Sequence, residues 1–377
     1  MKLRRTEKET AKQFDFPAPM YFIAKLVHQF PTMANLMNKT ESLILKRQIA
    51  DYAIDRPIYV TGMARAGTTI TLEMLSQHPS VATHRYLHMV LPYTPHFIQL
   101  AANVLPLMKS PVERLHKDRL LVTRDSPEAV EEIIWQRFFS SIVDESQSNI
   151  LDSTTSNPDF EMFYMEHLRK LLFNQNATRY AAKNNYNASR MEYLQKMFPD
   201  VRFVVVIRNP FDHIASLAKQ DIILRSFESA DPRLLDWTKI IGHREFGSAK
   251  ICINFGNSKT VEMIRNLWSS PGTYAQGWAV YWNEVYSYLF EKLDSNPNLA
   301  DATIVVRYED LCEFPEKTVD AIVQHVEIDP ESFRPIKEYY SSRLTMPTYY
   351  RTEYTEQEQQ DILRETEETA SRFGYSL

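Results

Sequence analysis

The chain has 377 residues, of which 44% are hydrophobic and 24% are charged, and its net charge is -5. This composition is typical of a globular protein with one large domain carrying insertions, or with two smaller domains. The negative charge argues against a nucleic acid as partner, because proteins that bind nucleic acids carry basic patches. No apolar stretch reaches the roughly 18 residues that span a bilayer. The charged N-terminus also does not read as a secretory signal, so we predict a cytoplasmic protein.

The predicted elements alternate between strand and helix patterns, which indicates an α/β fold with a mostly parallel sheet flanked by helices. The predicted strands are 58–61, 81–84, 179–183, 202–207 and 303–307. The predicted helices are 70–77, 127–142, 188–198, 211–224, 274–293 and 356–373. Ligands of such folds bind beyond the carboxyl ends of the strands, so the segments after each strand are the places to look for a site.

We divide the chain into an N-terminal helical segment over 1–50, an α/β domain over 51–330 and a C-terminal helical extension over 331–377. Within the domain, 221–271 has clusters of Gly, Asn and Ser without a clear period, and we assign 221–290 to an insertion or lid. The amphipathic stretch 20–37 is interpreted as packing against the core, with membrane contact as the alternative.

The first predicted strand is followed at 62–69 by the sequence GMARAGTT, which resembles a phosphate loop that has lost its lysine. Thr68 stands at the lysine position, and Arg65 supplies the cation with a planar fork that suits a phosphate or sulfate edge. The chain has only 8 glycines, so the placement of two of them between a strand and a helix favours a function. The pattern predicts an anion site that does not take a triphosphate with its metal.

A second anion site is predicted where strand 202–207 ends. A nucleotide triphosphatase usually has an Asp there to hold Mg²⁺, but this chain has Arg208. Pro210 can begin a helix whose first amides add partial positive charge, and Ser216 can donate to the same anion. An arginine at a strand end is often only a surface ion pair. Its pairing with the loop at 62–69 favours the anion site.

Together these residues resemble the sulfotransferases that use 3′-phosphoadenosine 5′-phosphosulfate (PAPS). In that family a loop T-G-M-x-R-x-G-T-T cradles the 5′-phosphosulfate, and R-x-P followed by a serine binds the 3′-phosphate. The matching residues here are 61–69 and Arg208 with Ser216. Further similarity at 77–79, 125–132, 183–185 and 306–312 extends the resemblance over roughly 55–330, and it is strongest to bacterial-type members with undefined acceptors.

The resemblance implies a phosphate-loop fold with a helical lid, PAPS as donor, and in-line, metal-free transfer of a sulfuryl group to a hydroxyl or amine. Arg65 would stabilise the charge on the leaving phosphate. Lys183 is equally well explained as a solvated strand-end lysine, and Arg307 as part of a surface charge network. The residues expected to bind the donor are Arg65, Ala66, Gly67, Thr68, Thr69, Lys183, Arg208, Ser216, Arg307 and Tyr308.

The base that takes the acceptor proton is less well defined. Many relatives place a carboxylate beyond the phosphate loop, in a window where this chain reads HRYLHM at 84–89. His88 is the nearest substitute, and His116, which has Asp118 close by, is the second candidate. A lone histidine is usually structural, so both assignments are hypotheses.

The acceptor and the oligomeric state stay open. A small molecule, a lipid and a carbohydrate all fit as acceptor, and neither a transmembrane segment nor a nucleic-acid partner is expected. The chain contains 20 Tyr, 20 Phe and 5 Trp, which is compatible with a hydrophobic acceptor pocket but is more often core. The alternatives are a nucleotide kinase or hydrolase of the phosphate-loop class, which the missing lysine and Asp disfavour, and a nucleotide-binding protein without catalysis.

Overall fold

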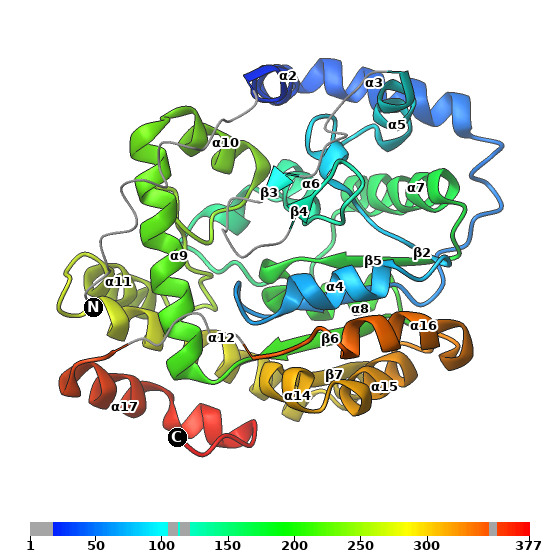
Figure 1. Cartoon of the computed structure of the whole chain (residues 1–377). Helices are drawn as coiled ribbons and strands as arrows, with labels where there is room; N and C mark the ends of the chain where they lie inside the picture. The colour runs from blue at the N-terminus through cyan, green and yellow to red at the C-terminus, as the bar shows by residue number, and fades with distance from the viewer. Residues whose placement is uncertain (1–17, 105–111, 114–120, 347–352) are drawn as a thin grey trace.

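A five-stranded parallel sheet lies at the centre of the protein, with helices on both faces (Figure 1). The computed structural model describes residues 18–104, 112–113, 121–346 and 353–377. The strand order is β2 (Val81–Ala82), β5 (Arg179–Lys183), β1 (Ile58–Thr61), β6 (Arg202–Ile207) and β7 (Thr303–Arg307). A separate antiparallel pair joins β3 (Val112–Glu113) to β4 (Leu121–Val122). The predicted α/β sheet is confirmed, and only the strand predicted at 81–84 ends earlier than expected.

The sheet forms because its strands are short apolar runs that can be buried on both sides. Ile58 of β1 pairs with Ala181 of β5 on one side and with Arg202 of β6 on the other. Tyr59 and Phe203 point into one core cluster, and Ile58 with Val60 points into the other. The strands of this five-stranded sheet all run parallel, so β1, β5, β6 and β7 end at the same edge of the sheet.

Two layers of helices cover the sheet. One face packs against α4 (Thr68–Ser76), α15 (Pro315–His325) and α16 (Pro330–Ser341). The other face packs against α7 (Pro158–Gln175), α8 (Met191–Met197), α9 (Pro210–Ala230) and α12 (Tyr274–Ser295). The remaining helices are α2 (Ala18–Gln29), α3 (Pro31–Leu45), α5 (Pro95–Val104), α6 (Glu131–Phe138), α10 (Arg233–Ile241), α11 (Ser258–Trp268), α13 (Pro297–Asp301), α14 (Tyr308–Glu313) and α17 (Glu356–Arg372), with 3-10 turns η2 (Tyr86–Met89), η3 (Ser140–Val143) and η4 (Asn185–Ser189).

Several predicted helices have other bounds in the structure. The helix predicted at 127–142 is only α6, because Pro127 is bridged to Arg85 as extended backbone and η3 follows the helix. The helix predicted at 188–198 is likewise only α8, and α9 runs past its predicted end. The region at 221–271 is not irregular: it contains the end of α9, then α10 and α11. The buried residues of α10 include Leu234, Trp237 and Ile241, a helical spacing that its polar neighbours obscure.

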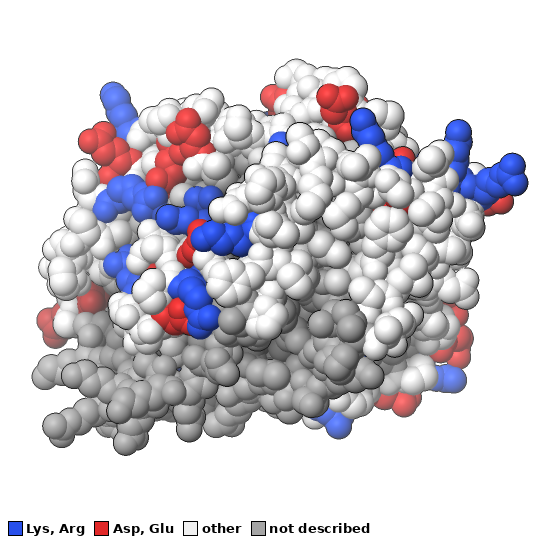
Figure 2. All heavy atoms as spheres, turned by 90° about the horizontal axis from the view of Figure 1, so that it is seen from above, with Lys and Arg blue, Asp and Glu red and all other residues white. Residues whose placement is uncertain are grey.

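The N-terminal helices α2 and α3 leave much apolar surface uncovered. The side chains of Phe22, Leu26, Phe30 and Leu36 are exposed, so packing against the core, the interpretation favoured for 20–37, does not hold for them. The face seen from above in Figure 2 shows a broad area without charged side chains, with Lys, Arg, Asp and Glu gathered mostly toward its margins. No helix among the described residues is long and apolar enough to cross a membrane.

Candidate active site

The loop after β1 has a conformation that only glycine tolerates at two points. Gly62 has a φ of +125°, and a Cβ there would lie 2.2 Å from the carbonyl oxygen of Val206. Gly67 has a φ of +105°, and a Cβ there would lie 2.6 Å from the Tyr308 ring. L side chains rarely adopt such φ values, and neither neighbour leaves room for one. The two glycines therefore bring the loop backbone close against β6 and α14.

Arg65 is a non-glycine residue in the left-handed region, with a φ of +72°. Such a conformation costs on the order of 1–3 kcal/mol and persists only where neighbours enforce it. Here the carbonyl of Ala64 accepts from His213 Nε2 at 2.8 Å, and the carbonyl of Arg65 accepts from Arg208 Nη1 at 3.4 Å. Strained residues of this kind gather at functional sites, so the Arg65 backbone is an independent indication that the loop is functional.

His213 holds the loop as a neutral imidazole. Trp282 Nε1 donates to His213 Nδ1 at 3.2 Å, which leaves the proton on Nε2 for the bond to Ala64. Complete burial lowers the pKa of His213 to about 3, and the bond to the Ala64 carbonyl offsets this only in part. The loop is further tied to the sheet by Tyr286, whose hydroxyl accepts from Met63 N and donates to Val206 O.

The two predicted anion sites meet at one place. Arg65 Nε donates to Ser216 Oγ at 3.3 Å, which links the loop to α9. Arg208 is only 5% exposed, and its guanidinium lies 4.9 Å from the centre of the Tyr308 ring. The structure thus brings Arg65, Arg208, Ser216 and Tyr308 together from the segments that follow β1, β6 and β7.

Helix α4 begins at this cluster with Thr68. Its N-cap residue is Gly67, which makes no side-chain capping bond. The first amides of a helix have no partner within the helix and carry partial positive charge. A buried arginine, Arg208, a half-buried one, Arg65, and a helix N-terminus without a side-chain cap are the elements of an anion site.

An open cleft lies beside the loop. Arg65 and Thr69 line one part of it, together with Lys183 at the end of β5. Helices α9 and α10 and the segment after α10 supply Gln220, Leu224, Trp237, Thr238, Ile241, His243, Glu245 and Phe246. The region predicted to be a lid therefore forms much of the cleft wall, although its role as a moving lid stays a prediction.

Glu128 also lines the cleft, and the sequence analysis assigned it no role. Burial opposes ionisation of this carboxyl group. His243, Lys183, the Tyr86 hydroxyl and the amide of Ala129 outweigh that effect and hold the pKa of Glu128 below its ordinary value. A carboxylate that is ionised at neutral pH therefore shares the cleft with Arg65. The signal was present, because Glu128 lies in the stretch 125–132 on which the family resemblance partly depends.

A buried ion pair fixes the segment that carries Lys183. Arg190 forms a two-pronged contact with Glu132, from Nη1 to Oε2 at 2.8 Å and from Nη2 to Oε1 at 3.0 Å. Asn184 Nδ2 donates to the same carboxylate at 2.9 Å, and Thr61 Oγ1 donates to the carbonyl of Asn184. The residue directly after Lys183 is therefore held by α6 and by β1, which directs the end of β5 toward the cleft.

The segment after α10 is anchored by Asp221. This fully buried carboxylate of α9 accepts from Gly247 N at 2.7 Å and from Lys250 Nζ at 3.0 Å. The Lys250 ammonium also lies 3.9 Å from the centre of the Trp268 ring, and burial lowers its pKa to about 8 although Asp221 opposes this. A buried, hydrogen-bonded charge pair fixes geometry more than it adds stability. It holds the loop that presents His243 and Glu245 to the cleft.

Two predicted site residues lie elsewhere, and a third falls outside the described residues. His88 is buried, is not among the residues lining the cleft, and accepts from Arg85 N at 2.9 Å. Burial, with help from His84 and Arg85, lowers its pKa well below the ordinary value. Arg307 pairs with Asp310 at 2.7 Å and donates to the carbonyl of Gly374. These contacts match the alternative interpretation of Arg307 as part of a surface charge network. His116 lies outside the described residues, so its role stays a prediction.

The remaining predicted donor-site residues all belong to the loop region. Ala66 and Thr68 are buried, while Thr69 faces the cleft. Among the described residues, no group of three or more His, Cys, Asp or Glu is placed to hold a metal ion.

Comparison with known proteins places this geometry in a family. The sulfotransferase family matches residues 57–241, a range that contains the loop, Glu128, Lys183, Arg208 and Ser216. This part of the chain belongs to the sulfotransferase family. Comparison with curated proteins finds no match.

Two solved structures of sulfotransferases are similar to this chain. Sulfotransferase STF9 from Mycobacterium avium superposes with a TM-score of 0.53 and 14% identity, over 89% of this chain and 82% of that one. Sulfotransferase STF1 from Mycobacterium tuberculosis H37Rv gives a TM-score of 0.49 and 16% identity, over 90% and 82%. The structure from Mycobacterium avium shows the similarity in fold, which is a parallel sheet with a phosphate-loop arrangement flanked by helices.

Proposed function

We propose that this sulfotransferase moves a sulfuryl group from PAPS to a hydroxyl or amine acceptor. The observation that supports it most is the joining of Arg65 to Ser216, with Arg208 bonded to the backbone of Arg65. PAPS carries anionic groups at its 5′ and 3′ positions. A cluster that presents one arginine from the loop and another from the end of β6 matches such a ligand better than it matches a single phosphate.

The cleft supplies what the reaction needs. The acceptor oxygen attacks sulfur, a new S–O bond forms, and the bond from sulfur to the bridging oxygen breaks with its electron pair left on the 5′-phosphate. Arg65 and the first amides of α4 stabilise that developing charge. Lys183, which lines the same cleft, adds positive charge near the sulfuryl group. The product is 3′-phosphoadenosine 5′-phosphate (PAP).

Glu128 takes the acceptor proton in this proposal. It is a carboxylate in the same cleft as Arg65, and its lowered pKa keeps it ionised at neutral pH. The sequence-based choices, His88 and His116, gain no support from the geometry, because one is buried away from the cleft lining and the other is not described. The proton passes from the acceptor to Glu128 and then to water.

The kinase or hydrolase alternative stays disfavoured by Thr68 at the lysine position and Arg208 at the Asp position. A measurement of turnover distinguishes the proposed enzyme from a nucleotide-binding protein without catalysis. We expect release of PAP from PAPS in the presence of mixed phenol, alcohol and amine acceptors, and loss of that release in Arg65→Ala. Binding of PAP without turnover on any acceptor class would favour the non-catalytic alternative. Donor identity and cytoplasmic location both stay predictions.

A further inference from the structure

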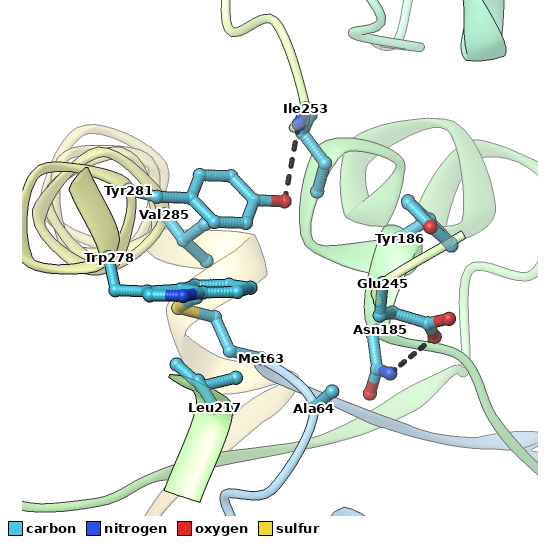
Figure 3. A pocket seen from close by; sticks show the side chains of 10 residues that line it. All are labelled: Met63, Ala64, Asn185, Tyr186, Leu217, Glu245, Ile253, Trp278, Tyr281 and Val285. Carbon is cyan, nitrogen blue, oxygen red and sulfur yellow. Dashed lines mark hydrogen bonds between the residues drawn. The ribbon is translucent and has the colours of Figure 1, made fainter. Parts of the chain in front are cut away.

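The N-terminal helices α2 and α3 present large apolar side chains to solvent. Phe22, Leu26 and Phe30 are spaced four residues apart, and Phe30 N donates to Leu26 O at 3.0 Å, so the three lie on one side of the chain. By contrast, Leu217, Trp278 and Val285 in the interior, drawn in Figure 3, are each 1% exposed. The apolar side chains of the N-terminal segment that are between 48% and 75% exposed form what we call the N-terminal apolar face: Phe22, Leu26, Phe30, Leu36, Leu43 and Ile44.

The two helices are anchored to the protein through their other side. Tyr21, Ala24 and Val27 of α2 are buried in the main core cluster. In α3, the buried carboxylate of Glu41 lies 3.2 Å from the fully buried Nζ of Lys170 in α7. The N-terminal apolar face is therefore not needed to hold α2 and α3 in place.

Helix α5 adds to this apolar surface. The amides of His96 and Phe97 at its start donate to Glu41 Oε1 at 2.9 and 2.8 Å, which fixes α5 beside α3 (Figure 1). Leu100 and Val104 of α5 are 50% and 85% exposed. Seen from above, from the side of α2, α3 and α5, the protein has a broad area without charged side chains (Figure 2). A large exposed apolar surface marks contact with another protein or with a membrane.

The exposed charges beside this surface are basic. Residues 18–50 contain a single acidic residue, Glu41, which is buried, whereas Lys39, Lys46 and Arg47 of the same segment are exposed. The whole chain has a net charge of -5, so this positive charge is local. Apolar side chains with Lys and Arg nearby are typical of helices that lie on anionic membranes. A second copy joined through the same face by a two-fold axis would bring these basic residues together, which disfavours a dimer there.

The surface is also close to the candidate active site. Asp236 of α10 accepts from the Tyr21 hydroxyl at 2.6 Å and from Lys25 Nζ at 2.8 Å, so α2 packs directly on α10. Helix α10 in turn supplies Trp237 and Ile241 to the wall of the cleft. One helix therefore separates α2 from the cleft.

We infer that the N-terminal apolar face binds the surface of an anionic lipid bilayer, with α2 and α3 lying in the plane of the membrane. The apolar side chains enter the boundary between the headgroups and the acyl chains, and Lys39, Lys46 and Arg47 contact anionic headgroups. Membrane binding of this kind requires neither the donor nor the base of the proposed function, so the two can be tested separately.

The test measures cosedimentation of the full chain with two kinds of vesicle, one of phosphatidylcholine alone and one of equal parts of phosphatidylcholine and phosphatidylserine. We expect binding to the anionic vesicles to be at least about tenfold tighter and to weaken as salt is added. Phe22→Ser with Leu36→Ser should weaken it by about tenfold or more, because two apolar side chains no longer enter the bilayer. The matched control is Phe314→Ser, which should bind as the wild type does. Phe314 is 58% exposed at the end of α14, a helix on the other face of the sheet.

A second pair of variants tests the basic residues. Lys46→Gln with Arg47→Gln should weaken binding to the anionic vesicles by about tenfold or more and leave any binding to phosphatidylcholine unchanged. Lys317→Gln with Arg334→Gln removes the same charge from exposed positions of α15 and α16 and should have little effect. All the substituted side chains are exposed, so unchanged midpoints of urea unfolding show that the variants are folded.

Failure of the wild-type chain to bind the anionic vesicles overturns the inference, as does binding that survives Phe22→Ser with Leu36→Ser. Equal binding to both kinds of vesicle overturns it too, because the basic residues would then contribute nothing. A dimer that the serine substitutions dissociate, in a chain that binds neither kind of vesicle, identifies a second copy as the partner instead.

Discussion

Arg65 donates from Nε to the hydroxyl of Ser216 at 3.3 Å, so one side chain connects the loop after β1 with the helix after β6. Arg208 completes the connection by donating to the carbonyl of Arg65. The residues predicted to bind the two ends of the donor are therefore neighbours in one cluster. Substitutions of Arg65 and of Arg208 should therefore change different contacts with the donor. Nucleotides with and without the 3′-phosphate can distinguish these effects.

Arg208→Ala should weaken PAP by about 100-fold or more, because removing one partner of a buried charge costs a few kcal/mol. Affinity for adenosine 5′-phosphate, which lacks the 3′-phosphate, should barely change. Calorimetry with both nucleotides measures the difference. The control is Arg202→Ala, at the other end of β6, where Arg202 pairs with Glu327. An equal loss for both nucleotides would mean that Arg208 holds the loop or the adenine instead.

Arg65→Ala should lower kcat more than it raises the KM for PAPS. The guanidinium gains strength as charge moves onto the leaving phosphate, and interactions made mainly in the transition state appear in kcat. Steady-state kinetics over a range of PAPS concentrations separate the two constants. A normal kcat with only a raised KM would show that Arg65 binds donor and transition state equally.

Glu128→Gln should lower kcat by about 100-fold, within the range expected for loss of a general base. The amide keeps an acceptor for the Ala129 N–H, and PAP affinity should stay unchanged. Glu245→Gln, which alters another carboxyl group of the same cleft, is the matched control and should retain activity.

The pH profile distinguishes the two kinds of base. Glu128 must be ionised to accept a proton, and its pKa is below the ordinary value, so activity should persist to a pH below the ordinary pKa of a glutamate. An acid limb of kcat/KM near 6.5, abolished in His88→Gln or His116→Gln, would favour the histidines that the sequence predicts.

Folding stability should fall as the pH drops below about 6.5, because the protein buries neutral histidines. Burial lowers the pKa of His84 and of His213 to about 3, so the unfolded chain binds more protons in this range. Each contributes up to about 1.4 kcal/mol per pH unit, present above about pH 6.5 and lost toward pH 3. Glu131, whose pKa burial raises to about 7, opposes part of this loss.

Urea unfolding between about pH 5 and 7 measures the slope. His213→Gln should reduce it by about one proton, and His28→Gln, at an exposed position, should not. An unchanged slope in His213→Gln would show that His213 does not stay neutral in the folded protein.

The sequence predicted the sheet well because its strands are uninterrupted buried runs bounded by clear turn signals. Arg202–Ile207 is such a run, and its bounds are confirmed to the residue. The helices of region 221–271 were harder to predict, because α10 and α11 are short and amphipathic. The polar residues on their exposed faces obscure the helical spacing of the buried apolar residues. The short helix α6 was overextended because Pro127 and its neighbours look helical in composition but form extended backbone.

The candidate site also contains residues that the sequence could predict and residues that it could not. The loop, Arg208 and Ser216 could be predicted because local chain geometry brings them to one edge of the sheet. Glu128 lies in the stretch 125–132 that carries part of the family resemblance, but that stretch does not show which of its residues enters the cleft, because the packing of the segment before α6 decides this. His88 shows the reverse case, since a chemically suitable residue at a plausible distance along the chain folds into the interior.

The central claim is that the cluster around Arg65 and Arg208 is built for a nucleotide with a 3′-phosphate. The most direct measurement is calorimetry of PAP and of ATP with the wild-type protein, in excess chelator and then with Mg²⁺. We predict that PAP binds without Mg²⁺ and more tightly than ATP under both conditions. Tighter binding of ATP that depends on Mg²⁺ would contradict the account.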